Sequence, residues 1–151
     1  MSKTEAVSFT NMCMIYDNKG NVLVQERTKQ DWPGITFPGG HVEKGEAFTA
    51  AMVREVFEET GLTVSDLQIC GIQDWIEDDG TRGMILLYKT DRFEGELSSS
   101  NEGKVYWVPL TALPHMRLAD NMETLLKLFC CSTLTEQFFY KENGEWTEVV
   151  K

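Results

Sequence analysis

Alternating apolar and polar positions predict β-strands along most of the chain. Residues 7–16 and 22–27 are rich in strand-forming residues, and the turn-forming run 17–21 separates them. We therefore expect these two segments to pair with each other as a hairpin. The last two predicted strands flank Asn143 and Gly144, which indicate a second hairpin. The later strands are predicted at residues 67–75, 84–90, 104–108, 137–140 and 146–150.

Two segments have the spacing of amphipathic helices. Residues 46–60 contain neither Gly nor Pro, and Gly61 follows at the position where a helix C-cap belongs. Strands outnumber helices, so the pattern predicts an α+β or α/β sandwich in which the two helices pack on a sheet. The second helical segment, residues 120–130, repeats apolar side chains at Met122, Leu125, Leu126 and Phe129.

Composition and charge narrow the class of protein. Hydrophobic residues make up 42% and charged residues 25% of the 151 positions, as in ordinary globular proteins. The formal charge of −10, with no cluster of Lys or Arg, argues against a nucleic-acid polymer as the partner. A small, highly charged anion can still bind, provided that a divalent cation bridges it to protein carboxylates.

The same features set expectations about the setting of the protein. No repeat, linker or low-complexity tract divides residues 1–151, so we expect a single domain. No apolar run approaches the roughly 20 residues that span a bilayer, and the first 15 residues lack the pattern of a signal peptide. We expect a cytoplasmic protein without membrane contact, either a monomer or a homodimer. The cysteines have no CxxC spacing, so Cys13 and Cys70 are expected to be buried free thiols.

Three acidic residues in the run REVFEE fall on one side of the first predicted helix. Glu55, Glu58 and Glu59 share one arc because a helix advances about 100° per residue. Like charges at this spacing destabilise a helix by a few tenths of a kcal/mol per pair, so the run is either a solvated acidic face or a site for a hard divalent cation. These six residues alone favour the solvated face. The side expected to be buried carries Ala50, Val53, Val56 and Phe57.

The wider segment changes that interpretation. Gly40, Glu46 and the run from Arg54 to Leu62 match the pattern G-x5-E-x7-R-E-U-x-E-E-x-G-U at every specified position, where U is aliphatic. Seven fixed positions coincide by chance on the order of once in 10⁹ windows. The segment resembles the Nudix box, and the strand order on both sides is similar to the Nudix fold. The resemblance implies an α/β/α sandwich, with the Nudix helix and a C-terminal helix packed on a mixed β-sheet.

The resemblance also implies a chemistry. Nudix enzymes hydrolyse a nucleoside diphosphate linked to another group, using Mg²⁺ or Mn²⁺ and attack of water on phosphorus. The metal ligands carry over to Glu55, Glu58 and Glu59 and to the backbone carbonyl of Gly39. Arg54 would orient the glutamates, and Glu46 would support the loop and the start of the helix. Phosphoryl transfer needs charge neutralisation and alignment more than covalent chemistry, which clustered carboxylates with metal can supply.

A further acidic residue precedes a late predicted strand. In the family an acid in this loop often reaches the metal site, and the matching residue here is Glu102. It is a candidate metal ligand or general base, and an exposed turn explains it equally well because the sequence does not show its reach to the attacking water.

The group that would bind the base is less defined. Asp120 and Asn121 lie near the start of the second helix, where nucleotide-pool sanitising members of the family read a purine edge. An Asn offers both a donor and an acceptor, but either residue could instead cap the helix. Trp32, Phe37 and Trp75 could stack on a base, although each is individually a good core residue.

The resemblance is strongest to the MutT-like 8-oxo-dGTP diphosphatases, which release a nucleoside monophosphate and pyrophosphate. Cleavage of ADP-ribose is less favoured, because members with that activity usually carry a proline some fifteen residues beyond the box and none lies between Pro38 and Pro109. Dinucleoside polyphosphate hydrolysis remains open. A prenyl diphosphate isomerase would want a catalytic Cys in a recognisable context. A non-catalytic nucleotide-binding module could dispense with the glutamates.

Overall fold

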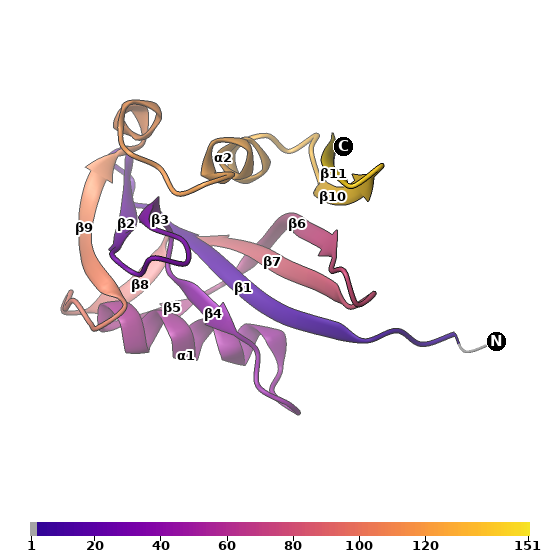
Figure 1. Cartoon of the computed structure of the whole chain (residues 1–151). Helices are drawn as coiled ribbons and strands as arrows, with labels where there is room; N and C mark the ends of the chain where they lie inside the picture. Colours follow the sequence, from indigo (N-terminus) through magenta and orange to yellow (C-terminus); the bar gives the residue numbers. More distant parts are fainter. Residues whose placement is uncertain (1–2) are drawn as a thin grey trace.

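Two strands far apart in the sequence form the centre of the fold. In the computed structural model, which describes residues 3–151, β1 (Val7–Ile15) runs parallel to β7 (Arg82–Thr90) (Figure 1). They lie within a six-stranded sheet of order β11-β10-β6-β7-β1-β4, in which β6 and β10 are also parallel and the other neighbours are antiparallel. The other four strands of this mixed sheet are β4 (Gly39–His41), β6 (Gln68–Ile76), β10 (Glu136–Glu142) and β11 (Glu145–Val150).

Two smaller sheets and two main helices complete the layers. A three-stranded sheet has the order β3-β2-β9, and a two-stranded sheet joins β5 to β8. Helix α1 lies below the large sheet in Figure 1 and α2 lies above it, so the predicted mixed-sheet sandwich with a helix on each side is confirmed. The bounds are β2 (Asn21–Arg27), β3 (Gly34–Thr36), α1 (Phe48–Thr60), β5 (Leu62–Ser65), β8 (Arg92–Gly95), β9 (Gly103–Pro109), a 3₁₀ helix (Leu110–His115) and α2 (Met122–Cys130). No helix in residues 3–151 is long and apolar enough to cross a membrane.

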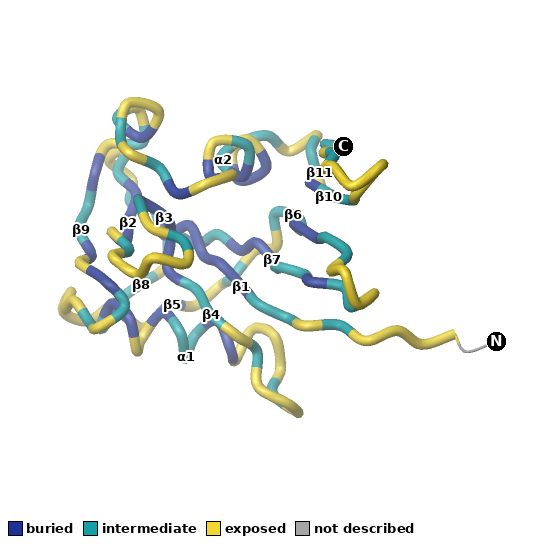
Figure 2. The backbone as a smooth tube through the Cα atoms, viewed as in Figure 1, coloured by how far each residue is buried: buried dark blue, intermediate teal, exposed yellow. Residues whose placement is uncertain are grey.

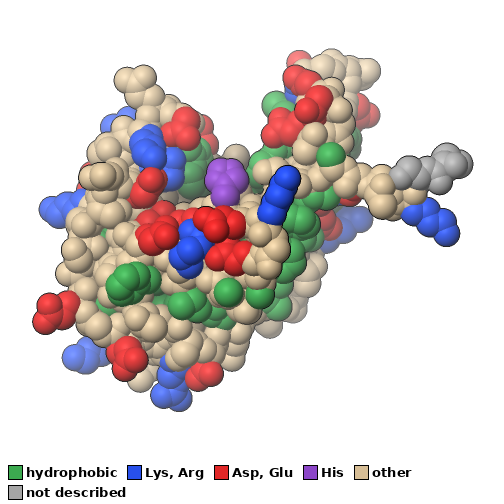
Figure 3. Space-filling model, turned by 90° about the horizontal axis from the view of Figure 1, so that it is seen from below, with side chains coloured by type: hydrophobic (Ala, Val, Ile, Leu, Met, Phe, Trp, Pro, Cys, Tyr) green, Lys and Arg blue, Asp and Glu red, His purple; other side chains and the backbone are tan. Residues whose placement is uncertain are grey.

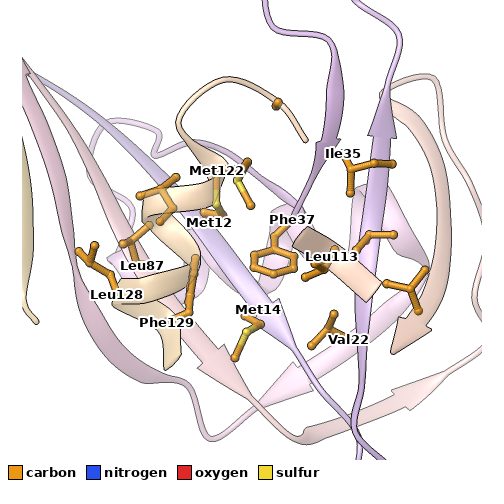
Figure 4. Close-up of a cluster of buried hydrophobic side chains, with 14 residues drawn as sticks. Met12, Met14, Val22, Ile35, Phe37, Leu87, Leu113, Met122, Leu128 and Phe129 are labelled. Carbon is orange, nitrogen blue, oxygen red and sulfur yellow. The ribbon is translucent and has the colours of Figure 1, made fainter. Parts of the chain in front are cut away.

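The central strands are buried on both faces, which divides the core into two clusters (Figure 2). Successive strand residues point to opposite faces, so Met12 and Met14 enter the cluster under α2. Phe37 lies in that cluster and packs edge-on against Phe129, with ring centroids 5.2 Å apart (Figure 4). Cys13 and Ile15 point the other way, into the second cluster. They lie there with Met52 and Val56 of α1.

The predicted hairpin of residues 7–16 and 22–27 is wrong. β1 pairs with β7 and β4, whereas β2 pairs with β3 and β9 in a different sheet. Only the turn survives: the Asp17 N–H donates to the Asn21 carbonyl at 3.0 Å, and Tyr16 forms one bridge with Val22. Each strand has two hydrogen-bonding edges, and partners distant in the sequence occupy both of them: β4 and β7 on β1, and β3 and β9 on β2.

The buried side of α1 matches the expected one only in part: Val56 is buried and Val53 is half-buried against the same core. Ala50 is exposed and Phe57 is 58% exposed, although both were expected to be buried. The helix instead turns another side inward, with Ala51, Met52, Val56, Glu59 and Thr60 buried. Met52 and Val56 fill the core below the sheet, and their helical neighbour Glu59 is drawn in with them because residues at i+3 and i+4 share a face.

Several local expectations are confirmed. Gly61 ends α1 in the left-handed conformation, with φ of 78°, and its N–H donates to the Phe57 carbonyl at 2.9 Å. The strands predicted at residues 67–75 and 84–90 are present as β6 and β7, and β10 and β11 form the predicted C-terminal hairpin. Cys13 and Cys70 are free thiols, of which Cys13 is buried and Cys70 is half-buried.

The C-terminal hairpin joins the sheet beside a buried acidic residue of β6. The Asp74 carboxylate accepts a hydrogen bond from Arg82 Nη1 at 2.8 Å, while its Oδ1 has no hydrogen-bond partner among the described residues. Burial, followed by the neighbouring Glu136 carboxyl of β10, raises the pKa of Asp74 to about 6, against the opposing effect of Arg82. The folded protein therefore holds a proton on this side chain more tightly than the unfolded chain does.

We predict that Asp74→Asn becomes increasingly stabilising relative to wild type as pH rises from 4 to 7. The pKa is higher in the folded than in the unfolded chain, so the stability that wild-type Asp74 contributes is present at low pH and is lost as pH rises through about 6. One pKa unit corresponds to about 1.4 kcal/mol, so the relative gain should be on the order of 2 kcal/mol. Thermal unfolding at a series of pH values measures it. Asp66→Asn, at an exposed site, is the control, and a difference that does not change with pH would contradict the prediction.

Candidate active site

Arg54 of α1 lies at the centre of an acidic group of side chains. Its Nε and Nη2 atoms donate to the two carboxylate oxygens of Glu46, at 2.8 and 3.0 Å. Its Nη1 atom donates to Glu55 at 2.9 Å and to Glu58 at 3.3 Å. Nη2 also donates to the His41 carbonyl of β4 at 3.0 Å, so one guanidinium joins the helix, the preceding loop and the edge of the sheet. Figure 3 shows acidic side chains gathered around a basic one on this side of the molecule.

Glu46 holds the loop that leads into α1. Besides Arg54, its carboxylate accepts the Glu43 N–H at 3.0 Å, which closes the turn before the helix. The hydrogen bonds between Arg54 and Glu46 lower the pKa of Glu46 and raise the pKa of Arg54. Both side chains therefore stay charged. This bidentate pair fixes the guanidinium in the orientation from which it reaches the glutamates.

Glu59 is the most buried of the three helix glutamates, with 3% of its surface exposed. Its carboxylate accepts the Gly39 N–H at 2.9 Å. Burial raises the pKa of Glu59 to about 8, and the nearby charges of Glu55 and Glu102 add to the rise against the opposing hydrogen bond from Gly39. Burial also raises the pKa of Glu55. Glu55 is paired with Arg54, whereas Glu59 has no ion pair with a basic side chain among the described residues.

Two buried amides border the same carboxylates. Asn11 accepts the Gly40 N–H through Oδ1 at 3.1 Å, and the Gln25 side chain lies near enough to Glu59 to lower its pKa. The nitrogen atoms of both amides are buried and have no hydrogen-bond partner within residues 3–151. Sequence reasoning missed both residues, although a polar residue inside an apolar strand is a signal that could have found them.

The paired glycines bring the backbone of β4 close to its neighbours. A Cβ atom at Gly39 would overlap the Asn11 carbonyl of β1, and one at Gly40 would overlap the Glu55 carboxylate. Neither position has room for a side chain, so the glycines let the sheet edge and the acidic helix approach each other.

Glu102, in the loop before β9, joins this cluster from another side. Both of its carboxylate oxygens lie 2.9 Å from Lys29 Nζ, and its charge acts on Glu55 and Glu59. The loop is ordered by the Glu102 N–H, which donates to Ser100 Oγ at 3.1 Å. The structure therefore brings the acidic loop residue to the same place as the helix glutamates.

The donor set suits Mg²⁺ or Mn²⁺, since both ions prefer carboxylate and carbonyl oxygen. Burial raises the pKa of Glu55 and of Glu59, so a cation beside these carboxylates would favour their charged forms. Within residues 3–151, however, no three acidic, His or Cys side chains are close enough to form a ready coordination site. Arg54 and Lys29 hold Glu55, Glu58 and Glu102 in ion pairs instead.

A cavity of about 550 Å³ lies on the α2 side of the large sheet. One wall comes from Trp32 and the start of α2, where Trp32 Nε1 donates to the Asp120 carbonyl at 2.9 Å. The remaining lining comes from alternate residues of adjacent strands, which point to the same face. The lining residues are Trp32, Gln73, Trp75, Ile85, Asp120, Asn121, Phe139 and Trp146.

The structure separates the sequence-based candidates for base binding. Trp32 and Trp75 line the cavity, whereas Phe37 is buried in the core and is not available to stack on a ligand. Asn121 has a left-handed backbone, with φ of 70°, and makes no capping hydrogen bond to α2. The helix-cap explanation of this residue is therefore wrong. Sequence reasoning missed the four lining residues Gln73, Ile85, Phe139 and Trp146.

The comparisons with known proteins agree with this arrangement. A family model described as a NUDIX domain matches residues 9–129. An uncharacterized Nudix hydrolase of Bacillus subtilis, YvcI, is 30% identical over 115 residues, which make up 73% of this chain and 70% of that protein. The chain therefore belongs to the Nudix family and is a pyrophosphohydrolase of nucleotide-linked diphosphates.

Two further similar proteins carry names that describe different activities. The crystal structure of a mutator MutT protein from Bacillus halodurans has a TM-score of 0.79 and 26% identity, covering 95% of this chain and 97% of that chain. The NAD-capped RNA hydrolase NudC of Mycobacterium tuberculosis is 35% identical over 66 residues, which are 42% of this chain and 20% of that protein. The family is thus shared by proteins with different named substrates.

We predict that Gly39→Ala destabilises the fold more than Gly40→Ala does. The new Cβ at position 39 meets a backbone carbonyl that cannot move without separating β1 from β4, whereas at position 40 it meets the end of a flexible side chain. Forced overpacking lowers the free energy of unfolding by about 1–3 kcal/mol. Each kcal/mol lost lowers Tm by about 2–4 °C in a chain of this size. Thermal unfolding measures both variants at the same pH. Equal melting temperatures would show that the sheet edge adapts to the extra methyl group.

Proposed function

We propose that this chain hydrolyses a nucleoside triphosphate such as 8-oxo-dGTP to the nucleoside monophosphate and pyrophosphate, with Mg²⁺ or Mn²⁺. The observation that carries the proposal is the pairing of two unlike sites. An acidic cluster built on α1 suits the phosphates with their metal, and a separate cavity lined by Trp32, Asp120 and Asn121 suits a base. None of the three helix glutamates lines that cavity, so base and phosphates occupy different places.

The acidic cluster supplies the hydrolytic half. Glu55, Glu58 and Glu59, with the Gly39 carbonyl, are the residues that we assign to the metal. A bound divalent cation would neutralise the phosphate charge and lower the pKa of an attacking water. Arg54 orients Glu55 and Glu58 through its hydrogen bonds. We assign Glu102 the role of metal ligand or general base, since its charge acts on both Glu55 and Glu59.

The cavity supplies the recognition half. Trp32 offers a ring face beside Asp120, and the two are joined by the indole hydrogen bond to the Asp120 carbonyl. The Asn121 amide is not used in a helix cap, so its donor and acceptor are available to a purine edge. The likeness to the MutT protein of Bacillus halodurans, which extends over 95% of this chain, supports a MutT-like activity.

The metal-dependent reaction is tested first. Turnover of a nucleotide panel should require Mg²⁺ or Mn²⁺ and stop in EDTA. Glu58→Gln should keep the fold, because this side chain is largely exposed, and lower kcat by more than about a hundredfold, since changes near metal ligands already cost about 10–100-fold. Glu123→Gln, an exposed residue of α2, is the matched control and should retain wild-type kcat. Full activity of Glu58→Gln, or activity in EDTA, would exclude the proposed metal site.

The base contact is tested by Asn121→Gly, which removes the amide and keeps the left-handed backbone without strain. We predict that the variant loses about tenfold in kcat/KM for its preferred purine nucleotide and little for the others, because a missing hydrogen bond is worth about 1 kcal/mol or more. The panel is 8-oxo-dGTP, dGTP, dATP and dCTP. An unchanged ranking of the four nucleotides would remove Asn121 from the base site, and an unchanged metal requirement serves as the internal control.

A further inference from the structure

Three side chains from three strands form a hydrogen-bonded relay that ends at the cavity. Gln73 of β6 lines the cavity and donates through Nε2 to Gln137 Oε1 of β10 at 2.8 Å. Gln137 in turn donates through Nε2 to Glu148 Oε2 of β11 at 3.1 Å. Gln137 is 0% exposed and Gln73 is 6% exposed, so the middle of the relay is shielded from water. Only the far end, at Glu148, is exposed to solvent.

The chemistry of Glu148 fixes the direction of every bond in this relay. A carboxylate can only accept, so Gln137 must present its amide nitrogen to Glu148 and its oxygen to Gln73. Gln73 must then present its nitrogen to Gln137, which leaves the Gln73 oxygen as the group directed away from the relay. Each amide could otherwise rotate by 180° with little change in shape, so the charge at one end decides the polarity at the other.

We infer that Glu148, acting through Gln137 and Gln73, makes the cavity select a base that presents an N–H donor. This inference rests on the proposed function in placing a base in the cavity. An oxygen acceptor at Gln73 matches an exocyclic amino group, as on adenine or guanine, and repels a ring that offers only acceptors there. Gln73 would contact the base, while Gln137 and Glu148 are positioning residues that set its orientation.

A single substitution at Glu148 can reverse the direction of the hydrogen bonds in the relay. In Glu148→Lys the terminal group can only donate, so Gln137 must turn its oxygen toward position 148 and its nitrogen toward Gln73. Gln73 then presents its nitrogen to the cavity. The cavity should then prefer a base that lacks the amino group over one that carries it. Glu148→Gln can do either and should abolish the preference. Glu145→Lys, an exposed change of the same charge on the same strand, is the matched control.

The experiment measures binding without metal, so that it does not depend on hydrolysis. Quenching of tryptophan fluorescence reports occupancy, because Trp32, Trp75 and Trp146 line the cavity. The probes are matched nucleoside monophosphates that differ by one amino group: dAMP against purine deoxyriboside monophosphate, and dGMP against dIMP. For at least one pair, wild type and Glu145→Lys should bind the amino form about tenfold more tightly. Glu148→Gln should bring that ratio near one, and Glu148→Lys should bring it below one.

The outcomes separate this inference from the proposed function. Equal binding of both members of both pairs by wild type, an unchanged ratio in Glu148→Lys, or no binding of any probe would overturn the relay as a specificity device. Hydrolysis of the triphosphates without discrimination would leave the proposed function in place. Discrimination between the monophosphates without metal-dependent turnover of any nucleotide would instead keep the relay and remove the proposed function.

Discussion

Burial of the central strands on both faces is the constraint on which the rest of the structure depends. β1, β2 and β7 each send alternate residues into two separate cores, so neither helix alone could cover them. Helix α2 covers the side chains of Met12 and Met14, and α1 covers those of Cys13 and Ile15. Asn11 lies on the same face of β1 as Cys13 and bonds to Gly40 next to the acidic cluster. Ile85 lies on the other face, with Leu87, and lines the cavity. The acidic cluster and the cavity therefore use residues on opposite faces of the central strands.

The crowding of three glutamates on one helix has an explanation in Arg54. Exposed ion pairs contribute little singly, but this guanidinium bonds to Glu46, Glu55, Glu58 and the His41 carbonyl at once. It offsets the repulsion between Glu55 and Glu58 and leaves the buried Glu59 without a cationic partner of its own. Burial raises the pKa of Glu59, and the nearby charges of Glu55 and Glu102 add to that rise. A cation supplied from outside would have to compete with Arg54 and Lys29 for the carboxylates of Glu55, Glu58 and Glu102.

Features set by neighbouring residues could be predicted from the sequence. The cap at Gly61, the Asn143-Gly144 hairpin and the grouping of the box residues depend on short-range geometry. Features set by distant partners could not. The parallel pairing of β1 with β7 spans some seventy residues, and the rotation of α1 that exposes Phe57 depends on which core its other side meets. The cavity was only partly foreseen, because Gln73 and Phe139 become neighbours of Trp32 only when β10 joins β6.

The C-terminal hairpin lies outside residues 9–129, the part of the chain that matches the family model. It nevertheless supplies Phe139 and Trp146 to the cavity and Gln137 and Glu148 to the relay. The lining of the cavity is thus divided between the part of the chain that matches the family model, which supplies Trp32, Asp120 and Asn121, and the hairpin beyond it. Exchange or remodelling of this hairpin offers an evolutionary route, and an engineering one, by which such an enzyme can change its substrate while the hydrolytic machinery stays untouched.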